Sequence, residues 1–361
     1  MAEEVAPLLN AGAAIGDFKI IEFIGHGGSG QVYRARDLNH CRTVALKIIP
    51  IDLLKAEAIR RFEEEAKSLA AFNDERIVQF FDSRAHEGLY YISMEFVPGE
   101  NLEKLCRGST IPPRAAAIMA RDVARALVHA HKERIIHRDI KPSNILVNQE
   151  TGKIKVADFG LARRLDDPVG RTRTGVVMGT HGYMSPEQAR GESKRTDERT
   201  DVYGVGATLY FILTRHPPFA GDSPEEIRNR TLKEEPQPLR KIDQTIPRNL
   251  EIICLKCLEK LPENRYQSAL DLVQDLNGFL DSNSIRAEQD LWSRRISGWK
   301  RRHGKKFYAA ALLIGLLVAT GCIFYYQQWR ATKMQLWETQ TPTGTFRTAS
   351  RERAARKGAV A

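Results

Sequence analysis

Two stretches of the chain carry side chains at the spacing that phosphoryl transfer requires. Asp139 and Asn144 belong to the string His-Arg-Asp-Ile-Lys-Pro-Ser-Asn at 137–144, and Asp158 opens Asp-Phe-Gly 19 residues after Asp139. The reaction needs a carboxylate that receives the acceptor hydroxyl, and oxygen ligands for magnesium. Either aspartate alone is typical of an ordinary turn. Together, in these contexts, they predict the catalytic centre of a phosphotransferase.

A glycine-rich turn upstream offers a place for phosphate groups. Residues 25–32 read Gly-His-Gly-Gly-Ser-Gly-Gln-Val between two strand patterns, and Gly30 precedes Lys47 by 17 residues. Glycines permit a tight turn and a close backbone approach, so amide N–H groups can face phosphate oxygens. Such a turn alone is typical of a hairpin, but a lysine at this distance indicates a nucleotide site. The apolar residues expected to cover the adenine are Ile24, Val32 and Ala45.

Lys47 needs a negative partner, because an unpaired buried ammonium is costly. Strand alternation places Lys47 on the same face as Ala45. The helix predicted next offers three consecutive glutamates, Glu63, Glu64 and Glu65. At about 100° per residue, Glu64 points away from the apolar stripe of this helix, whereas Glu65 lies closest to it and Glu63 next. Helical geometry therefore leaves Glu65 and Glu63 as candidates.

With Val-Ala-Leu-Lys at 44–47 upstream of both strings, the chain resembles the eukaryotic-type protein kinase superfamily and, within it, the membrane-anchored Ser/Thr kinases of bacteria. The resemblance implies ATP as the phosphate donor and Mg²⁺ as the metal, with Mn²⁺ as an alternative. It implies that Asp139 is the base and that Lys141 neutralises charge on the γ-phosphate. Asn144 and Asp158 are expected to supply metal-binding oxygens. Lysine at position 141 accompanies Ser/Thr specificity in the family, so the expected partners are proteins with Ser/Thr acceptors.

The resemblance also assigns residues around the nucleotide. It selects Glu65 as the partner that places Lys47 on the α- and β-phosphates, and Met94 as the residue behind the adenine. The backbone groups of Glu95 and Val97 are expected at the adenine edge. The complete set expected to contact the nucleotide is Ile24, Gly25, Gly27, Gly28, Gly30, Val32, Ala45, Lys47, Met94, Glu95 and Val97. The set expected to act in the transfer is Lys47, Glu65, Asp139, Lys141 and Asn144.

Residues 158–187 resemble an activation segment. A phosphate on Thr172 or Thr174 would add about −1.5 to −2 charge and could dock on Arg138. The resemblance to the bacterial membrane kinases implies autophosphorylation at one or both of these threonines. A mobile polar loop is the alternative. Three further residues are implied to support the fold: Glu187 pairing with Arg265, and Asp201 holding the backbone of the catalytic loop. Thr180 is expected to shape the substrate site near Asp139.

Apolar periodicity predicts a strand-rich segment followed by a helix-rich one. Strands are expected over 17–50, 77–81 and 89–96, with one helix at 56–72. Later helices are expected over 114–132, 201–214, 223–233, 249–261 and 268–279. The order indicates an α+β, bilobal protein-kinase-like fold. The expected divisions are a tail at 1–16, a kinase domain at 17–281 with lobes 17–97 and 98–281, a basic juxtamembrane segment at 282–306, a transmembrane helix at 307–326 and a disordered tail at 327–361.

The net charge of +10 is concentrated near the C-terminus. Residues 294–306 carry seven basic and no acidic side chains, and residues 327–361 carry a net +5, which leaves −2 for the rest. A nucleic-acid-binding domain carries its basic patch on a folded surface, so the distribution argues against nucleic acid as a partner. The five cysteines form no disulfide pattern. Cys254 and Cys257 lie in a predicted helix, which favours buried structural thiols over a redox or metal site.

Residues 307–326 contain no charged side chain over 20 positions. A helix of that length spans about 30 Å, the thickness of the hydrocarbon core. A buried helix of a soluble domain is the alternative, but no flanking elements would cover it. Residues 1–16 are not expected to act as a signal peptide, and the basic cluster before the span predicts a cytoplasmic kinase domain. The prediction is a single-pass protein of the cytoplasmic membrane. Ala311, Gly315 and Ala319 recur at a spacing that lets two such helices pack, which leaves a homodimer open.

Two other functions compete with the kinase interpretation. A pseudokinase scaffold would bind nucleotide without transfer. Against it stands the presence of Lys47, Glu65, Asp139, Asn144 and Asp158. A small-molecule kinase could share the two lobes. The elements Gly-Thr-x-x-Tyr and Ser-Pro-Glu at 179–187, which shape a platform for peptides in the family, argue against that alternative.

Overall fold

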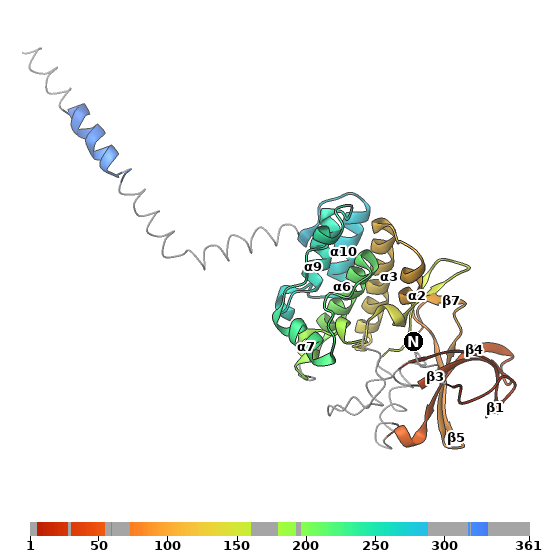
Figure 1. Ribbon diagram of the computed structural model, residues 1–361. Helices are drawn as coiled ribbons and strands as arrows, with labels where there is room; N and C mark the ends of the chain where they lie inside the picture. Colours follow the sequence, from red (N-terminus) through yellow and green to blue (C-terminus); the bar gives the residue numbers. More distant parts are fainter. Residues whose placement is uncertain are drawn as a thin grey trace, which may run out of the picture. The chain divides into compact units, whose positions relative to one another are not determined.

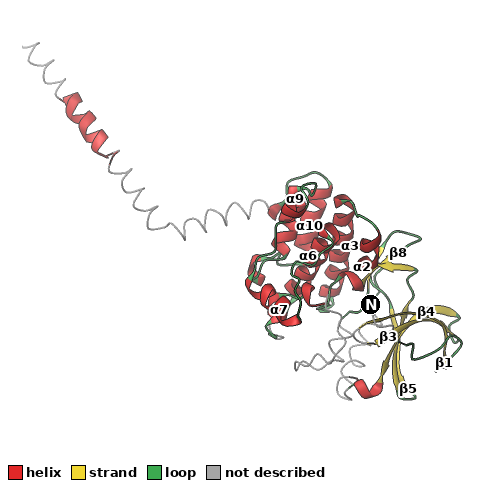
Figure 2. Cartoon of the chain, viewed as in Figure 1, coloured by secondary structure: helices red, strands yellow, loops and turns green. Residues whose placement is uncertain are grey.

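The computed structural model of the chain describes residues 6–27, 30–54, 59, 73–159, 180–192, 196–287, 317 and 319–330. Contacts divide the chain into one unit from Met1 to Gln289 and a second from Asp290 to Ala361. Within the first unit, a strand-rich part precedes a helix-rich part (Figure 1, Figure 2). This arrangement confirms the predicted α+β fold with two lobes.

The strand-rich part is a six-stranded antiparallel sheet in the order β1-β2-β3-β4-β6-β5. The strands are β1 (Ala14–Ile15), β2 (Phe18–Gly27), β3 (Gly30–Asp37), β4 (Arg42–Pro50), β5 (Phe80–His86) and β6 (Leu89–Glu95). Side chains alternate in burial along β3. Tyr33 and Ala35 face a packed cluster that includes Ile15 and Phe18, while Val32 faces the other side. A short 3₁₀ turn, Ile51–Leu53, follows β4.

A second sheet, in the order β7-β8-β9, carries the candidate catalytic residues at its ends. Its strands are β7 (Gly99–Asn101), β8 (Ile145–Asn148) and β9 (Ile154–Val156). The string 137–144 runs directly into β8, and Asp158 follows β9 by two residues. Because β8 and β9 pair antiparallel, with Ile145 opposite Val156, the end of the string and Asp158 meet at one edge of the sheet.

The helical part encloses one apolar core between α3, α6, α9 and α10 (Figure 1). α6 lies at its centre and is buried along most of its length, so it is hydrophobic on all sides rather than amphipathic. Gly204 of α6 allows the chain around Ile140 to approach, because an added Cβ would lie 2.7 Å from that side chain. The helices are α2 (Leu102–Gly108), α3 (Pro113–Lys132), α5 (Pro186–Ala189), α6 (Glu198–Thr214), α7 (Pro224–Lys233), α8 (Leu239–Ile242), α9 (Arg248–Cys257) and α10 (Ala269–Leu280), with 3₁₀ turns at Pro142–Asn144, Thr180–Tyr183 and Pro262–Asn264.

Three predicted elements differ from the observed ones at their ends. The strand expected at 77–81 begins only at Phe80, because Ile77 instead bridges Val156 and the Val78 N–H donates to the Val156 carbonyl. α6 begins at Glu198 rather than at 201, because the side chain of Asp197 accepts from the Arg199 N–H as an N-cap. α9 ends at Cys257 rather than at 261, ahead of the 3₁₀ turn that begins at Pro262. The helix expected at 56–72 lies outside the described residues, apart from position 59.

The folded unit extends beyond the expected domain 17–281 at both ends. In the segment expected to be a tail, Ile15 is buried and β1 pairs with β2. At the other end, Ile285 and Ala287 are buried, and the N–H groups of Arg286 and Ala287 donate to the Asp275 carboxylate. Both extensions bury single apolar residues in short segments, which leave no periodic signal in the sequence.

The two cysteines of the CxxC string lie on α9 and are fully buried. Burial raises the pKa of both thiols, so neither forms a reactive thiolate, as the sequence indicates. Of the predicted span 307–326, positions 307–316 and 318 lie outside the described residues. Within the described part of the chain, no helix combines the length and the apolar character needed to cross a membrane.

Candidate active site

The backbone of the string 137–144 is held by one buried carboxylate from α6. Asp201 is 1% exposed and accepts hydrogen bonds from the His137 N–H at 2.8 Å and from the Arg138 N–H at 2.7 Å. Its Oδ2 also lies 2.8 Å from Nε2 of His131 at the end of α3. The supporting role expected for Asp201 is therefore confirmed, and His131 is a partner that sequence reasoning missed.

The Asp139 carboxylate is oriented by two side chains from its own loop. Its Oδ2 accepts from Asn144 Nδ2 at 3.0 Å and lies 2.8 Å from Lys141 Nζ. Asn144 Nδ2 also donates to the Asp139 carbonyl at 2.9 Å, and the Asp139 N–H donates to His137 Nδ1 at 3.1 Å. The side chain of Asp139 remains 32% exposed. A positioned carboxylate that is open on one side can receive a proton from an incoming hydroxyl.

Asp158 lies beside Asn144 because the Ala157 N–H donates to the Asn144 carbonyl at 2.8 Å. The backbone of Asp158 has φ of 59°, a left-handed conformation that aspartate tolerates better than most residues. Arg138 also has a positive φ, 66°. Strained backbone of this kind clusters at functional sites and persists where the surroundings fix it. Here Phe159 is 6% exposed, and the centroid of its ring lies 4.5 Å from that of His137. This contact helps to fix the backbone at Asp158.

Lys47 contacts Asp158 across 111 residues of chain. Its Nζ lies 3.0 Å from Asp158 Oδ2, and Lys47 is only 4% exposed. Burial disfavours ionisation of Asp158, but the Lys47 ammonium and its hydrogen bond outweigh that effect and lower the Asp158 pKa below the ordinary value. The carboxylate is therefore ionised at neutral pH. The sequence predicted Glu65 as the partner of Lys47, and Glu65 lies outside the described residues; the contact with Asp158 was not predicted.

The register of the first sheet aligns the residues expected around the adenine. Ala45 pairs with Met94, Val32 with Lys47, and Gly25 with Val32. Met94 and Val97 are 8% and 7% exposed, whereas Ile24 is 42% exposed. Within the described part of the chain, the Val97 N–H and carbonyl form no hydrogen bond, which leaves both groups available to a ligand edge. Gly27 pairs with Gly30 across the glycine-rich turn.

Glu95 has a role that the sequence did not indicate. Its N–H donates to the Gln79 carbonyl at 2.8 Å, and its carboxylate lies 2.9 Å from Lys155 Nζ and accepts from the Gln79 N–H. Lys155 belongs to β9, three residues before Asp158. The side chain of Glu95 thus ties the strand beside Met94 to the strand that carries Asp158. A lysine and a glutamate 60 residues apart give no periodic signal from which the pair could be inferred.

Glu187 and Arg265 form the buried ion pair that the resemblance implied. Arg265 Nη1 and Nη2 donate to the two Glu187 carboxylate oxygens at 2.8 Å each, and both side chains are at most 2% exposed. Burial opposes ionisation of Glu187, but the Arg265 guanidinium lowers its pKa to about 2. One residue later, Gln188 Nε2 donates to the Arg138 carbonyl at 2.7 Å, so α5 is fixed directly to the catalytic loop.

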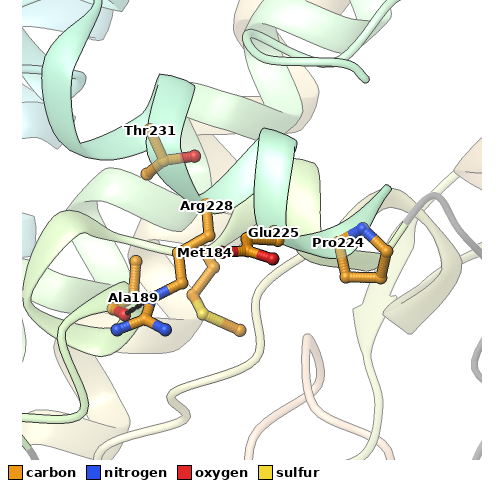
Figure 3. Close-up of a pocket in the computed structure, with 6 residues that line it drawn as sticks. All are labelled: Met184, Ala189, Pro224, Glu225, Arg228 and Thr231. Atoms are coloured by element: carbon orange, nitrogen blue, oxygen red, sulfur yellow. Dashed lines mark hydrogen bonds between the residues drawn. The ribbon is translucent and has the colours of Figure 1, made fainter. Parts of the chain in front are cut away.

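A cavity of about 280 Å³ lies between the start of α5 and α7 (Figure 3). Its apolar lining comes from Met184, Ala189 and Pro224, and Glu225 and Arg228 are exposed at its edge. Arg228 Nε donates to the Ala189 carbonyl at 2.6 Å, which fastens α7 to α5. The cavity therefore belongs to the elements that surround the catalytic loop.

The structure brings Lys47, Asp158, Asn144, Asp139 and Lys141 together from β4, β9 and the string before β8. Several predicted residues cannot be placed, because they lie outside the described residues: Glu65, Gly28, Thr172 and Thr174. Thr180 begins a 3₁₀ turn, but its side chain is likewise not described. Among the described residues, no cluster of three or more His, Cys, Asp or Glu side chains could hold a metal ion. The oxygens of Asn144 and Asp158 nevertheless suit Mg²⁺, which binds through few protein ligands together with phosphates and water.

Comparison with protein families gives one match over this unit: residues 18–276 fit the protein kinase domain. The chain is 40% identical over 265 residues to serine/threonine-protein kinase PknB of Mycobacterium leprae and 41% identical over 267 residues to PknB of Mycobacterium tuberculosis. It is 36% identical over 291 residues to a probable serine/threonine-protein kinase of Streptomyces coelicolor. These matches cover 72–79% of this chain but only 42–43% of each relative, so the chain spans less than half the length of these relatives.

Solved structures give the same fold. The kinase domain of PknI from Mycobacterium tuberculosis superposes with a TM-score of 0.60 at 22% identity, covering 74% of this chain and 98% of that domain. Rad53, solved with AMP-PNP, superposes with a TM-score of 0.60 at 28% identity, covering 72% of this chain and 64% of the other.

Proposed function

The chain belongs to the protein kinase family, and we propose that it transfers the γ-phosphate of ATP to serine and threonine hydroxyls of proteins. One observation supports this above all others. A lysine, a proton acceptor and two side chains with oxygen ligands come from three separate stretches of chain: Lys47 contacts Asp158, the Ala157 N–H next to Asp158 donates to the Asn144 carbonyl, and Asn144 contacts Asp139. Phosphoryl transfer requires mainly positioning and charge neutralisation, and this group supplies both.

Each polar side chain has a distinct task in this proposal. Lys47, held by Asp158, reaches the α- and β-phosphates, and Glu65 is its second partner. Asp139 orients the acceptor hydroxyl and takes its proton on the exposed side of the carboxylate. Lys141, 2.8 Å from Asp139, is close enough to neutralise charge on the phosphate being transferred. Mg²⁺, with Mn²⁺ as an alternative, would be held by Asn144 and Asp158 and would neutralise charge on the phosphates.

The nucleotide is proposed to lie against the first sheet. The glycine-rich turn holds the phosphates, and Val32, Ala45 and Met94 line the adenine site. Rad53, which shares this fold at 28% identity, was solved with AMP-PNP, and that supports a nucleotide site here. The Val97 backbone, which is free of hydrogen bonds to the described residues, would bind the adenine edge.

A test of the enzymatic proposal is transfer of labelled γ-phosphate to the chain itself and to a generic basic protein. Asp139→Asn keeps the volume and the Asn144 contact but removes the proton acceptor, and general base catalysis contributes about 10²–10⁴-fold. A loss of that size, with nucleotide binding retained, supports the kinase. Equal labelling by both proteins would leave the pseudokinase scaffold as the better account. Labelling of small hydroxylated metabolites alone would favour the small-molecule kinase.

Autophosphorylation of Thr172 or Thr174 is part of the proposal. Arg138 Nε is buried and has no hydrogen-bond partner within the described part of the chain, so this guanidinium has donor capacity for a phosphate. Replacing both threonines by alanine should lower turnover without changing nucleotide affinity. Unchanged turnover in the double variant would remove the regulatory role.

Membrane anchoring is also proposed, on the strength of the uncharged stretch 307–326 and the basic residues before it. The protein would then be a single-pass protein of the cytoplasmic membrane with its kinase domain in the cytoplasm, and the small residues of the span would allow a homodimer. The test is fractionation after carbonate washing, with a variant lacking 307–326 as control. Release of both proteins into the supernatant would contradict the anchor.

A further inference from the structure

The N-terminal segment before β1 crosses β3 at the base of the glycine-rich turn. The carboxamide of Gln31 makes two bonds to it: the Leu8 N–H donates to Oε1 at 2.8 Å, and Nε2 donates to the Ala6 carbonyl at 2.9 Å. Tyr33, two residues along β3, adds a hydroxyl that donates to Gln31 Oε1 and accepts from the Leu9 N–H at 3.1 Å. We call residues Ala6–Leu9 the N-terminal strap.

The geometry of these bonds leaves no ambiguity about the orientation of the Gln31 amide. A backbone N–H can only donate and a carbonyl can only accept, so Oε1 faces Leu8 and Nε2 faces Ala6. The carboxamide thus bonds to the residues on either side of Pro7. In a parallel sheet, the N–H and carbonyl of one residue bond in the same way to the two residues that flank the opposite position. Pro7, which has no N–H, stands between the Ala6 carbonyl and the Leu8 N–H that this pairing uses.

Gln31 is 6% exposed and Tyr33 is fully buried, whereas Ala6, Pro7 and Leu8 lie at the surface, so the network is buried on its β3 side. A buried amide that loses its partners is costly, and the carboxamide of Gln31 therefore favours the bound position of the strap. The chain that follows the strap is held by β2: the Gly12 N–H donates to the Ile20 carbonyl, and the Ile20 N–H donates to the Ala13 carbonyl, each at 2.8 Å.

Gln31 occupies the position where this anchor reaches the nucleotide site. It follows Gly30, the residue at which the chain returns from the glycine-rich turn, and it pairs with His26 on β2 and with Ile48 on β4. An added Cβ at Gly30 would lie 2.5 Å from the Ile48 carbonyl, so the turn is pressed against β4 beside Lys47. On the opposite face of β3, the neighbouring Val32 is directed to the proposed adenine site.

We propose that Gln31 is a positioning residue for nucleotide binding, and that the N-terminal strap, through Gln31, holds the glycine-rich turn in the position that receives ATP phosphates. The inference rests on the proposed function of the site. The strap touches neither ATP nor the acceptor protein, so its loss should weaken nucleotide binding and leave the affinity for the protein substrate unchanged.

Leu8 offers a matched pair of variants. Its side chain is 45% exposed, so Leu8→Ala changes little, whereas Leu8→Pro removes the one N–H that Gln31 Oε1 accepts. Leu8→Pro in the full chain should raise the KM for ATP by about tenfold, which corresponds to about 1.4 kcal/mol, with the KM for a protein substrate unchanged. Leu8→Ala should match the parent.

A double-mutant cycle identifies the contact. Gln31→Ala should raise the KM for ATP by a similar factor, and the double variant Leu8→Pro with Gln31→Ala should be no worse than either single one, because both act through one bond. Gln31→Glu keeps the acceptor for Leu8 but places a carboxylate oxygen against the Ala6 carbonyl, and should lie between the parent and Gln31→Ala. Effects that multiply in the double variant would overturn the inference.

Hydrogen exchange separates failure of this inference from failure of the proposed function, since it needs no catalysis. Without nucleotide, the amides of residues 25–32 should exchange faster in Leu8→Pro than in Leu8→Ala, while those of α6 should be equally protected in both. A uniform change throughout the unit, or none at 25–32, would show that the strap only stabilises the fold and would overturn the proposal. If the parent protein binds no nucleotide while Leu8→Pro and Leu8→Ala still differ in exchange at residues 25–32, the result would contradict the proposed function and not the role of the strap.

Discussion

Two buried ion pairs, one at the candidate active site and one in the helical part, differ in what surrounds them. All five N–H donors of Arg265 have acceptors: both oxygens of Glu187, and the carbonyls of Glu259, Arg199 and Lys260. Glu187 accepts a further bond from the Thr200 hydroxyl at 2.6 Å. Among the described residues, the only polar contact of the Lys47 ammonium is the one with Asp158, whose side chain is 26% exposed.

The contrast separates ion pairs that complete a fold from those that await a ligand. The Glu187–Arg265 pair has no unused donor, so it can only stabilise the position of the segment before α5. Counting the described residues alone, the ammonium of Lys47 gives one of its three N–H donors to Asp158, and the carboxylate of Asp158 has acceptor capacity to spare. Unfilled capacity beside a strained backbone is typical of a binding site. Removing a partner should therefore cost stability at one pair and activity at the other.

The largest effect is expected at the saturated pair. Glu187→Gln leaves the Arg265 guanidinium buried without a counter-charge, and breaking a buried pair in this way costs about 3–5 kcal/mol. The measurement is the free energy of unfolding from denaturant titration. Lys153→Ala is the matched control, because Lys153 pairs with Glu75 at 3.1 Å while both side chains are at least 65% exposed. That pair is worth at most about 1 kcal/mol. If Glu187→Gln and Lys153→Ala lower the free energy of unfolding by similar amounts, the Glu187–Arg265 pair does not stabilise the fold more than a surface pair does.

Lys47→Met should show the converse behaviour. Phosphate transfer should fall by about 10²–10³-fold, because a positioned cation on the phosphates is lost from the transition state. The free energy of unfolding should change by less than about 1 kcal/mol, because methionine fills the same space and Asp158 keeps access to water. Turnover of labelled ATP and denaturant titration measure the two quantities. If Lys47→Met unfolds as readily as Glu187→Gln, the pair at the site is structural as well.

The sequence predicted the parts of the site that lie close together along the chain. Asp139, Lys141 and Asn144 come from one string, and their mutual bonds follow from that string alone. Family resemblance supplied two long-range contacts, Glu187 with Arg265 and Asp201 with the backbone of the catalytic loop, and the geometry of both is confirmed. In the fold, apolar periodicity located α3, α6, α7, α9 and α10 to within a few residues, whereas the short helices α2, α5 and α8 were not predicted.

Contacts between a side chain and a distant backbone could not be predicted where no family resemblance indicated them. Gln188 reaches the Arg138 carbonyl over 50 residues, and Gln31 reaches the Ala6 carbonyl over 25, yet neither glutamine stands in any periodic pattern. The start of β5 was missed for a related reason: Ile77 is apolar and looks like strand sequence, but its partner is Val156 of the second sheet. Packing in three dimensions decides which partner each of these residues contacts, so the local sequence carries no signal of the choice.

Acid should weaken the fold mainly through the saturated pair. Arg265 overcomes the cost of burial and lowers the Glu187 pKa from 4.5 to about 2. A carboxyl with a depressed pKa in the fold stabilises fully above its unfolded value and loses that contribution as the pH falls from about 4.5 toward 2. The decline should amount to about 3 kcal/mol, and Glu187→Gln should lack it. Thermal unfolding between pH 6 and 2.5 measures both slopes. Parallel slopes would assign the acid sensitivity to other carboxyls.

Alkali offers the smallest effect and tests the comparison with a third cation, the half-buried Lys260, which forms no salt bridge within the described part of the chain. Lys260 Nζ donates to the Thr231 carbonyl at 2.7 Å and lies 4.0 Å from the centre of the Phe219 ring, and burial lowers its pKa from 10.5 to about 8. The fold thus releases this proton before the unfolded chain does, so stability should rise between about pH 8 and 10.5. The gain should be about 1 kcal/mol after allowance for solvent screening.

The measurement for Lys260 is the difference in unfolding free energy between the parent and Lys260→Met at pH 7.5 and at pH 10. Taking the difference cancels the opposing contribution of buried tyrosines such as Tyr210, whose pKa burial raises to about 12. Lys233→Met, at an exposed lysine on α7, is the control and should give the same difference at both pH values. A larger advantage of the parent at pH 7.5 than at pH 10 would mean that a carbonyl and a ring compensate a buried ammonium as well as a carboxylate does. The difference between Lys47–Asp158 and Glu187–Arg265 would then be explained by the geometry of their hydrogen bonds and not by the presence of a carboxylate charge.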